Sequence, residues 1–89
     1  MKSYLTKGFR KCMGKLTADV QDRAMAAYLL WRDNPRHSSL RFKQVHATRP
    51  IFSVRVDRSH RVLGVRKGKD MIWFWIGRHD EYMKAISRY

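Results

Sequence analysis

The stretch DMIWFWIGRHDEYM, from Asp70 to Met83, decides how this chain folds. Its apolar run from Met71 to Ile76 is followed at Gly77 by an abrupt change to polar residues. Successive residues of a strand face opposite sides of a sheet, so an unbroken apolar run predicts an interior strand covered on both faces. The run is far too short to span a membrane. We therefore expect the rest of the domain to pack around this strand.

A period of two in hydrophobicity marks three segments upstream of this strand. They run over residues 40–43, 52–56 and 61–66. Residues 57–60 form a turn-like segment, and residues 67–70 form a second tight turn. Strands joined by such short turns pair in antiparallel fashion. The sequence thus predicts a four-stranded antiparallel sheet.

Two helical patterns precede the strands. The first follows Thr6, a suitable N-cap, and the second begins at Thr17 and must end near Asn34, since Pro35 disfavours helix in the residue before it. Each pattern has one apolar face, made by Phe9, Met13 and Leu16 in the first and by Val20, Ala24, Ala27, Tyr28 and Trp31 in the second.

A short helix over residues 80–89 closes the chain. The order of elements predicts an α+β fold, with an N-terminal helical hairpin packed on one face of the sheet and the short C-terminal helix after it. We expect the helices to share one face and residues 1–89 to form a single domain.

Charge is the strongest functional signal. Twenty Lys and Arg against seven Asp and Glu give a net charge of +13, which points to an anionic partner. Ten of these cations but a single acid, Asp57, lie between Arg36 and Lys69, mostly on the predicted strands and turns. A solvated surface is the plain interpretation of such a face. Its single charge sign nevertheless favours contact with nucleic acid or nucleoprotein.

Cysteine and histidine usage excludes several kinds of site. Cys12 is the only cysteine, so neither an internal disulfide nor a cysteine-based zinc site can form. The histidines, His37, His46, His60 and His79, have no metal-ligand spacing. We expect no metal and no cofactor. The N-terminus runs straight into charged residues without a secretory signal, and we expect a cytoplasmic protein.

Arg55 and Arg61 each interrupt a hydrophobic alternation close to the same turn. If the hairpin pairs Val56 with Arg61, the two arginines lie on opposite faces of the sheet. A one-residue bulge or a longer loop would instead put them on one face. The alternation leaves both arrangements open.

The helical hairpin and the segments LRFKQV (40–45), FSVRVDRSHRVLGV (52–65) and WFWIGRHDEY (73–82) together resemble the RelE/ParE superfamily of bacterial toxin–antitoxin systems. The resemblance covers about residues 9–86. Many members carry a short first strand before the helices. Residues 1–5 are short and polar, so we expect this strand to be missing.

The resemblance implies one of two activities. RelE-like members are ribosome-dependent, metal-independent endoribonucleases that cut mRNA, whereas ParE-like members poison DNA gyrase. Both kinds are held inactive by a cognate antitoxin, and the toxin–antitoxin complex represses its own operon. The implied partners are therefore an antitoxin, mRNA on the ribosome, and operator DNA only through the antitoxin complex, with no membrane.

Catalytic roles also follow from the resemblance. Cleavage of RNA without metal uses the neighbouring 2′-OH as nucleophile, with proton transfer and with cations that stabilise the phosphorane. Arg55 and Arg61 match basic family positions, and Arg61 suits a phosphate clamp because its planar fork binds two oxygens. His79 matches the position after the apolar strand and suits a general acid. Ser53 departs from the family and removes one expected cation.

RNA contact is expected from a further set of basic and aromatic side chains: Arg41, Lys43, His46, Arg49, Arg78 and Tyr82. Tyr82 could stack on a base, but packing of the last helix is its plainer role. The glutamate that some members use as general base has no counterpart, since no acid occurs between Asp33 and Asp57. Lys43 and His46 are weak substitutes for it.

Three hypotheses follow from these residues. An mRNA interferase is favoured, because ParE-like chains usually lack a histidine or arginine at the position of His79. A gyrase inhibitor without catalysis is the second. The third is an inactive module that only binds antitoxin and represses the operon.

Overall fold

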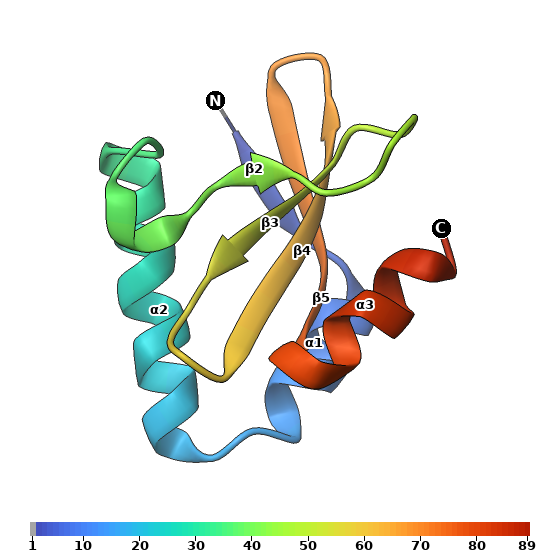
Figure 1. Cartoon of the computed structure of the whole chain (residues 1–89). Coiled ribbons are helices and arrows are strands. Elements are labelled where there is room, and N and C mark those ends of the chain that lie inside the picture. The colour runs from blue at the N-terminus through green and yellow to red at the C-terminus, as the bar shows by residue number, and fades with distance from the viewer. Residues whose placement is uncertain (1) are drawn as a thin grey trace.

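The computed structural model describes residues 2–89, which form three α-helices and a five-stranded sheet (Figure 1). The elements are β1 (Ser3–Leu5), α1 (Lys7–Gly14), α2 (Ala18–Asp33), a 3-10 helix (Ser38–Leu40), β2 (Lys43–Gln44), β3 (Ile51–Arg55), β4 (His60–Lys67), β5 (Asp70–Arg78) and α3 (His79–Ser87). The strand order is β1-β5-β4-β3-β2, with β1 parallel to β5 and the other pairs antiparallel. The α+β class is confirmed, but the sheet is mixed and has one strand more than expected.

The additional strand is β1, which the sequence was expected to lack. It pairs with β5 through backbone hydrogen bonds: the Met71 N–H donates to the Lys2 carbonyl at 2.9 Å, and the Thr6 N–H donates to the Trp73 carbonyl at 3.1 Å. An edge strand held in this way needs no apolar pattern, and the side chains of Tyr4 and Leu5 are exposed. The strand therefore left no signal in the hydrophobicity.

The segment 40–43 was expected to be a strand and is not one. The 3-10 helix ends at Leu40, Arg41 takes a left-handed φ of 46°, and β2 begins only at Lys43. Leu40 and Phe42 reach the core from this irregular backbone, where Phe42 stacks on Phe52 at 5.1 Å between ring centroids. Their burial produced the alternation without a strand.

Local signals placed the helices correctly. The Thr6 hydroxyl accepts the Phe9 N–H at 3.0 Å and caps α1, and the Thr17 hydroxyl accepts the Val20 N–H at 3.5 Å and caps α2. Asn34 ends α2 as expected. Within residues 2–89, no helix is long and apolar enough to cross a membrane.

A bulge in β5 directs its two tryptophans to opposite faces of the sheet. Leu63 pairs with Trp75 and Gly64 pairs with Trp73, which leaves Phe74 as an extra residue on β5. Trp73 packs beneath α1 and α2, while Phe74 and Trp75 pack toward α3. The apolar run is thus covered on both faces, as predicted.

The helices do not share one face, which corrects the expected arrangement. We call the side covered by α1 and α2 the hairpin face and the opposite side the α3 face (Figure 1). The buried cluster of the hairpin face is Phe9, Ala24, Ala27, Trp31, Leu40, Val54, Met71, Trp73 and Ile76. The cluster of the α3 face is smaller, with Ile51, Leu63 and Ala85 buried and with Val45, Phe74, Trp75, Tyr82 and Ile86 packed against them. One short helix therefore covers only part of the α3 face.

Trp73 and Trp75 each lie against a glycine of a strand. A Cβ atom added to Gly64 would lie 2.4 Å from Cε3 of Trp73, and one added to Gly77 would lie 2.6 Å from Cζ2 of Trp75. Such distances are too short for any side chain, so both glycines are required for close packing. Gly77 is also the cross-strand partner of Arg61, which brings the Trp75 ring beside the charged end of the α3 face.

Candidate functional site

Arg55 of β3 and Arg61 of β4 are direct cross-strand partners. Both side chains therefore begin on the α3 face, which decides between the two arrangements that the sequence left open. Val56 lies opposite His60, whose carbonyl accepts its N–H at 3.1 Å, so the connection is longer than a tight hairpin. Like charges directly opposite each other destabilise a sheet. Stability of the fold therefore does not explain why these two arginines are paired.

The Arg61 guanidinium is held by one of its nitrogens. Nη1 donates to the Asp57 carbonyl at 2.7 Å and to the His60 carbonyl at 2.9 Å. Nε and Nη2 have no acceptor in the part of the chain that the structure describes. These two nitrogens form one edge of the guanidinium fork, which matches two oxygens of a phosphate. Arg61 is therefore both fixed and available.

Several charges converge on Arg61. Burial lowers the pKa of the Arg61 guanidinium, and the positive charge of Arg55 lowers it further, as does that of Arg41. Tyr82 and Asp57 act on this pKa in the opposite direction. Arg41 and Tyr82, two of the expected RNA-contact residues, thus lie near the arginine pair. Arg55 and Arg61 are half-buried and Arg41 is exposed, and their three positive charges together favour an anion at this place.

Arg55 carries a further sign of an unfilled requirement. Its Nε is buried and has no acceptor among residues 2–89. A buried donor without a partner lowers stability by about 1–3 kcal/mol.

Lys43, one of the expected RNA contacts, begins on the same face of the sheet as the arginine pair. It is the cross-strand partner of Ser53, which is buried and lies two residues before Arg55 on the same face. Lys43 is therefore directed to the α3 face beside the position where a cation was missing. The pairing of β2 with β3, which periodicity did not predict, makes this arrangement.

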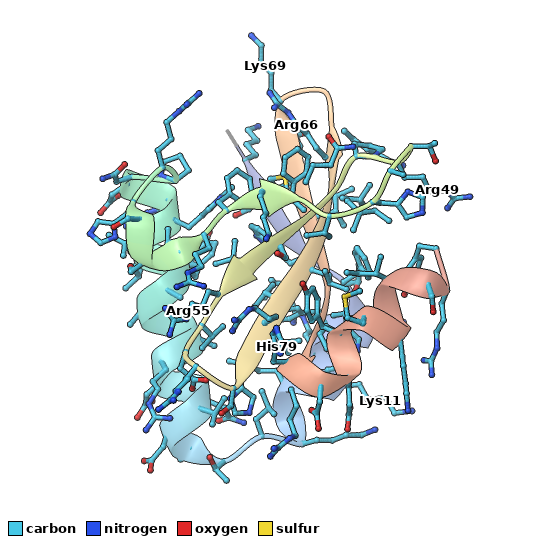
Figure 2. All side chains as sticks on the ribbon, viewed as in Figure 1. Lys11, Arg49, Arg55, Arg66, Lys69 and His79 are labelled. Atoms are coloured by element: carbon cyan, nitrogen blue, oxygen red, sulfur yellow. The ribbon has the colours of Figure 1, made fainter. Side chains whose placement is uncertain are left out.

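His79 and Tyr82 border the cluster from α3. His79 is the first residue of α3, and its N–H donates to the Ser59 carbonyl at 2.6 Å. Its ring centroid lies 5.0 Å from that of Tyr82. Tyr82 packs on the cluster of the α3 face, in agreement with its plainer role. In Figure 2, Arg55 and His79 lie at the same end of the sheet.

Three expected RNA contacts lie apart from this cluster. His46 and Arg49 belong to the β2–β3 loop at the opposite end of the sheet (Figure 2), where Nδ1 of His46 accepts the Arg49 N–H at 3.0 Å. Arg78 is the cross-strand partner of His60, so its side chain begins on the hairpin face. The structure gives His46 a role in shaping its loop. Residues 2–89 contain no group of three or more His, Cys, Asp or Glu that could hold a metal ion.

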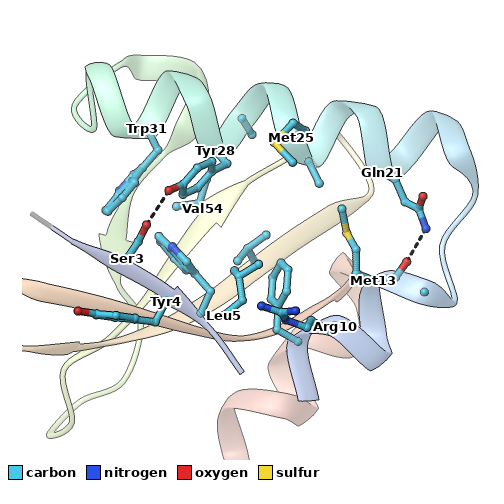
Figure 3. A pocket seen from close by; sticks show the side chains of 16 residues that line it. Ser3, Tyr4, Leu5, Arg10, Met13, Gln21, Met25, Tyr28, Trp31 and Val54 are labelled. Atoms are coloured by element: carbon cyan, nitrogen blue, oxygen red, sulfur yellow. Dashed lines mark hydrogen bonds between the residues drawn. The ribbon is translucent and has the colours of Figure 1, made fainter. Parts of the chain in front are cut away.

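A cavity of about 760 Å³ forms a second feature, on the hairpin face between β1 and α2 (Figure 3). The Ser3 hydroxyl and the Tyr28 hydroxyl lie 2.8 Å apart at one wall. Trp31 and Trp73 line the cavity, and their buried Nε1 atoms have no acceptor among the described residues. The exposed side chains of Tyr4, Leu5 and Met25 also line it. This lining is mostly apolar, unlike the cationic site on the other face.

Comparison with known families agrees with this architecture. A model described as the ParE-like toxin domain matches residues 18–84. The chain belongs to the ParE-like toxin family. It is thus a toxin of the RelE/ParE superfamily, and the resemblance drawn from the sequence is confirmed. A search of curated proteins by sequence finds no match.

Solved structures of low sequence identity share the fold of this toxin. The RelB–RelE antitoxin–toxin complex from Methanococcus jannaschii gives a TM-score of 0.74 at 11% identity, covering 92% of this chain and 96% of that chain. YafQ from E. coli gives 0.74 at 9% identity, covering 91% and 96%. The YoeB/ParE toxin from Agrobacterium tumefaciens gives 0.68 at 13%, covering 89% and 99%. Chains named RelE and ParE share this fold, so the choice of activity rests on the site.

Proposed function

We propose that this toxin is a metal-independent endoribonuclease that cleaves mRNA on the ribosome. The observation that carries the proposal is the cross-strand pairing of Arg55 and Arg61 on the α3 face, with His79 at the adjacent start of α3. Two opposed cations weaken the sheet, and the free Nε and Nη2 groups of Arg61 are donors that an anion would satisfy. We therefore assign both arginines to binding the negative charge of RNA.

The proposed reaction is an in-line attack of a ribose 2′-oxygen on the adjacent phosphorus. The 2′-OH gives up its proton to water, the 2′-O–P bond forms, the P–O5′ bond breaks, and the products are a 2′,3′-cyclic phosphate and a 5′-hydroxyl. The Nε and Nη2 edge of Arg61 holds two phosphate oxygens, and Arg55 adds charge that stabilises the phosphorane. His79 donates the proton that the leaving 5′-oxygen needs.

Neighbouring residues would extend the RNA path beyond the scissile phosphate. The positive charge of Arg41 lowers the pKa of Arg61, and Lys43 lies beside Ser53 on the α3 face. We assign both to phosphates next to the cleavage site, which lets Lys43 replace the cation that Ser53 does not supply. Tyr82 lies close enough to His79 to bound the site with its ring, in addition to packing α3.

The partner of this toxin in the cell is, in our proposal, an antitoxin that holds it inactive in the cytoplasm and joins it to operator DNA. Solved relatives include RelB–RelE complexes from M. jannaschii and Pyrococcus horikoshii. We propose that an apolar segment of an acidic antitoxin enters the cavity between β1 and α2. The net charge of +13 and the exposed Leu5 and Met25 support this.

Variants at the cavity test the antitoxin proposal. Leu5→Asp and Met25→Asp put a charge into an apolar contact and are expected to weaken antitoxin binding at least about tenfold, as measured by calorimetry. RNA cleavage should be unchanged. Leu29→Asp, at an exposed leucine of α2 that does not line the cavity, is the matched control. Equal weakening by all three variants would contradict a specific site.

Growth arrest on induction tests the nuclease. Arg61→Ala and His79→Ala should each relieve the arrest, while Arg66→Ala on the same strand and His37→Ala at an exposed turn should not. Primer extension on mRNA from the induced cells should show discrete cuts for the toxic forms only. Full toxicity of both site variants would overturn the catalytic assignment.

Inhibition of DNA gyrase is the second candidate, and the ParE name of the matching family model favours it. Under this alternative the toxin binds gyrase and performs no chemistry. The order of arrest distinguishes the two candidates. If DNA replication stops first and mRNA remains intact, the nuclease proposal is wrong.

A further inference from the structure

Asp57 lies in the turn between β3 and β4, beside the proposed site. Both oxygens of its carboxylate have partners in the protein. Oδ1 accepts the Ser59 N–H at 2.8 Å and lies 3.0 Å from Nδ1 of His60. Oδ2 accepts from Nη1 of Arg23 on α2 at 3.2 Å. Asp57 and His60 are mostly buried, with 19% and 13% of their side chains exposed. One carboxylate therefore joins the turn, the start of β4 and α2.

The backbone of this same turn holds two of the three proposed catalytic residues. The Asp57 and His60 carbonyls accept from Nη1 of Arg61, and the Ser59 carbonyl accepts the N–H of His79. One of these three carbonyls belongs to Asp57 itself. The other two belong to Ser59 and His60, which bind the Asp57 carboxylate through the Ser59 N–H and the His60 ring. A change in the carboxylate would thus move the acceptors of both Arg61 and His79.

We infer that Asp57 is a positioning residue for the proposed nuclease site, where it sets the direction of the free Arg61 edge and the start of α3. This inference rests on the proposed function. Asp57 is not itself assigned to substrate, because each of its carboxylate oxygens already accepts from the protein.

The physical reason is that Arg61 alone is poorly constrained. A long arginine side chain loses much rotamer freedom when it is held in one geometry, and Arg55 repels it from across the sheet. Two carbonyl acceptors at one nitrogen offset both effects while they leave the Nε and Nη2 edge free. The Asp57 carboxylate fixes the turn in the shape that presents these carbonyls.

The first test needs no substrate. Asp57→Ala in the whole chain should raise the hydrogen-exchange rate of the His79 amide about tenfold, which corresponds to one lost hydrogen bond. It should also move the NMR signals of the Arg61 side-chain N–H groups. The amide of Trp73, deep in β5, should keep its protection. Unchanged His79 exchange and unchanged Arg61 signals would overturn the inference, whatever the activity of the protein.

The second test separates positioning from a loss of folded protein. With RNA cleavage by the wild type established, Asp57→Ala should lower kcat about 100-fold per folded molecule with little change in KM, because misplacement of a reacting group has this effect. Asp57→Asn retains an acceptor for the Ser59 N–H and should recover part of kcat and of His79 protection. An unchanged kcat in both variants would overturn the inference.

Two controls and one independent outcome complete the design. Asp33→Ala removes a carboxylate that pairs with Arg32 on α2, outside the turn, and should change neither exchange nor kcat. Arg23→Ala removes only the link to α2, and its effect should be smaller than that of Asp57→Ala. A wild-type chain that cleaves no RNA would overturn the nuclease proposal, while the exchange experiment would still decide whether Asp57 positions Arg61 and His79.

Discussion

The hairpin face and the α3 face are built on the same strands, yet their centres differ. Two helices cover the hairpin face, and its strand residues Val54, Trp73 and Ile76 are all apolar and buried. One short helix covers the α3 face, where apolar packing ends and the pair Arg55 and Arg61 begins. A face that is only partly covered leaves room for charged side chains that remain half-buried. Incomplete coverage is therefore what makes a site possible.

The largest expected effect comes from making the α3 face resemble the hairpin face. Arg55→Met should lower the RNA-cleavage rate about 100-fold by removing one phosphate donor. It should also raise the free energy of unfolding by about 1 kcal/mol, since it removes a like-charge pair and a buried donor without acceptor. Single-turnover kinetics and urea unfolding measure the two quantities. Arg66→Met, at an exposed cation of β4, should change neither, and a less stable Arg55→Met variant would contradict the argument.

Substitution of Gly64 and of Gly77 compares the two faces of the sheet directly. Gly64→Ala and Gly77→Ala should each lower the free energy of unfolding by about 1–3 kcal/mol, because the new Cβ atoms meet Trp73 and Trp75. Gly77 is the cross-strand partner of Arg61, whereas Gly64 lies over the hairpin-face core. Only Gly77→Ala should therefore lower the cleavage rate per folded molecule. Equal rates for the two variants would mean that Trp75 does not support the site.

The smallest expected effect is a pH dependence that originates at the turn. Burial raises the pKa of Asp57, but hydrogen bonds from His60, Ser59 and Arg23 outweigh it and leave this pKa below its ordinary value. A carboxylate with a lowered pKa adds stability above the unfolded-state pKa of about 3.9, and this stability is lost as the pH falls through the folded-state pKa. The free energy of unfolding of the wild type should exceed that of Asp57→Asn by about 1 kcal/mol near pH 7.

Urea unfolding at several pH values checks this dependence. The difference between wild type and Asp57→Asn should shrink as the pH falls below about 4, because the asparagine does not titrate. Asp33→Asn, at a side chain that is 74% exposed, should differ little from wild type at any pH. A difference for Asp57→Asn that is constant from pH 7 to acid would place its cause outside the carboxylate charge.

Local signals in the sequence predicted most of the secondary structure. Thr6 and Thr17 cap the two helices as expected, and the apolar run of β5 became the interior strand. The failures were β1 and the segment 40–43. A short edge strand needs only backbone hydrogen bonds, and the alternation of Leu40 and Phe42 arose from core contacts made by an irregular segment.

The candidate site was predicted less completely than the fold. Its members Arg55, Arg61 and His79 were named from the sequence, but whether the arginines share a face depended on the length of a turn. The place of Lys43 beside Ser53 required the register of β2 on β3, and the role of the Asp57 carboxylate required its contact with Arg23 of α2. Such contacts leave no periodic pattern in the chain.

The sequence by itself determined the α+β class, the starts of α1 and α2, the end of α2 and the net charge of +13, because caps, apolar spacing and composition are local properties. Only the tertiary structure decided strand register and the faces of the sheet. A shift of one residue moves every following side chain to the other face, as the bulge at Phe74 does between Trp73 and Trp75. Register in turn decided that Arg55 and Arg61 are cross-strand partners on the α3 face.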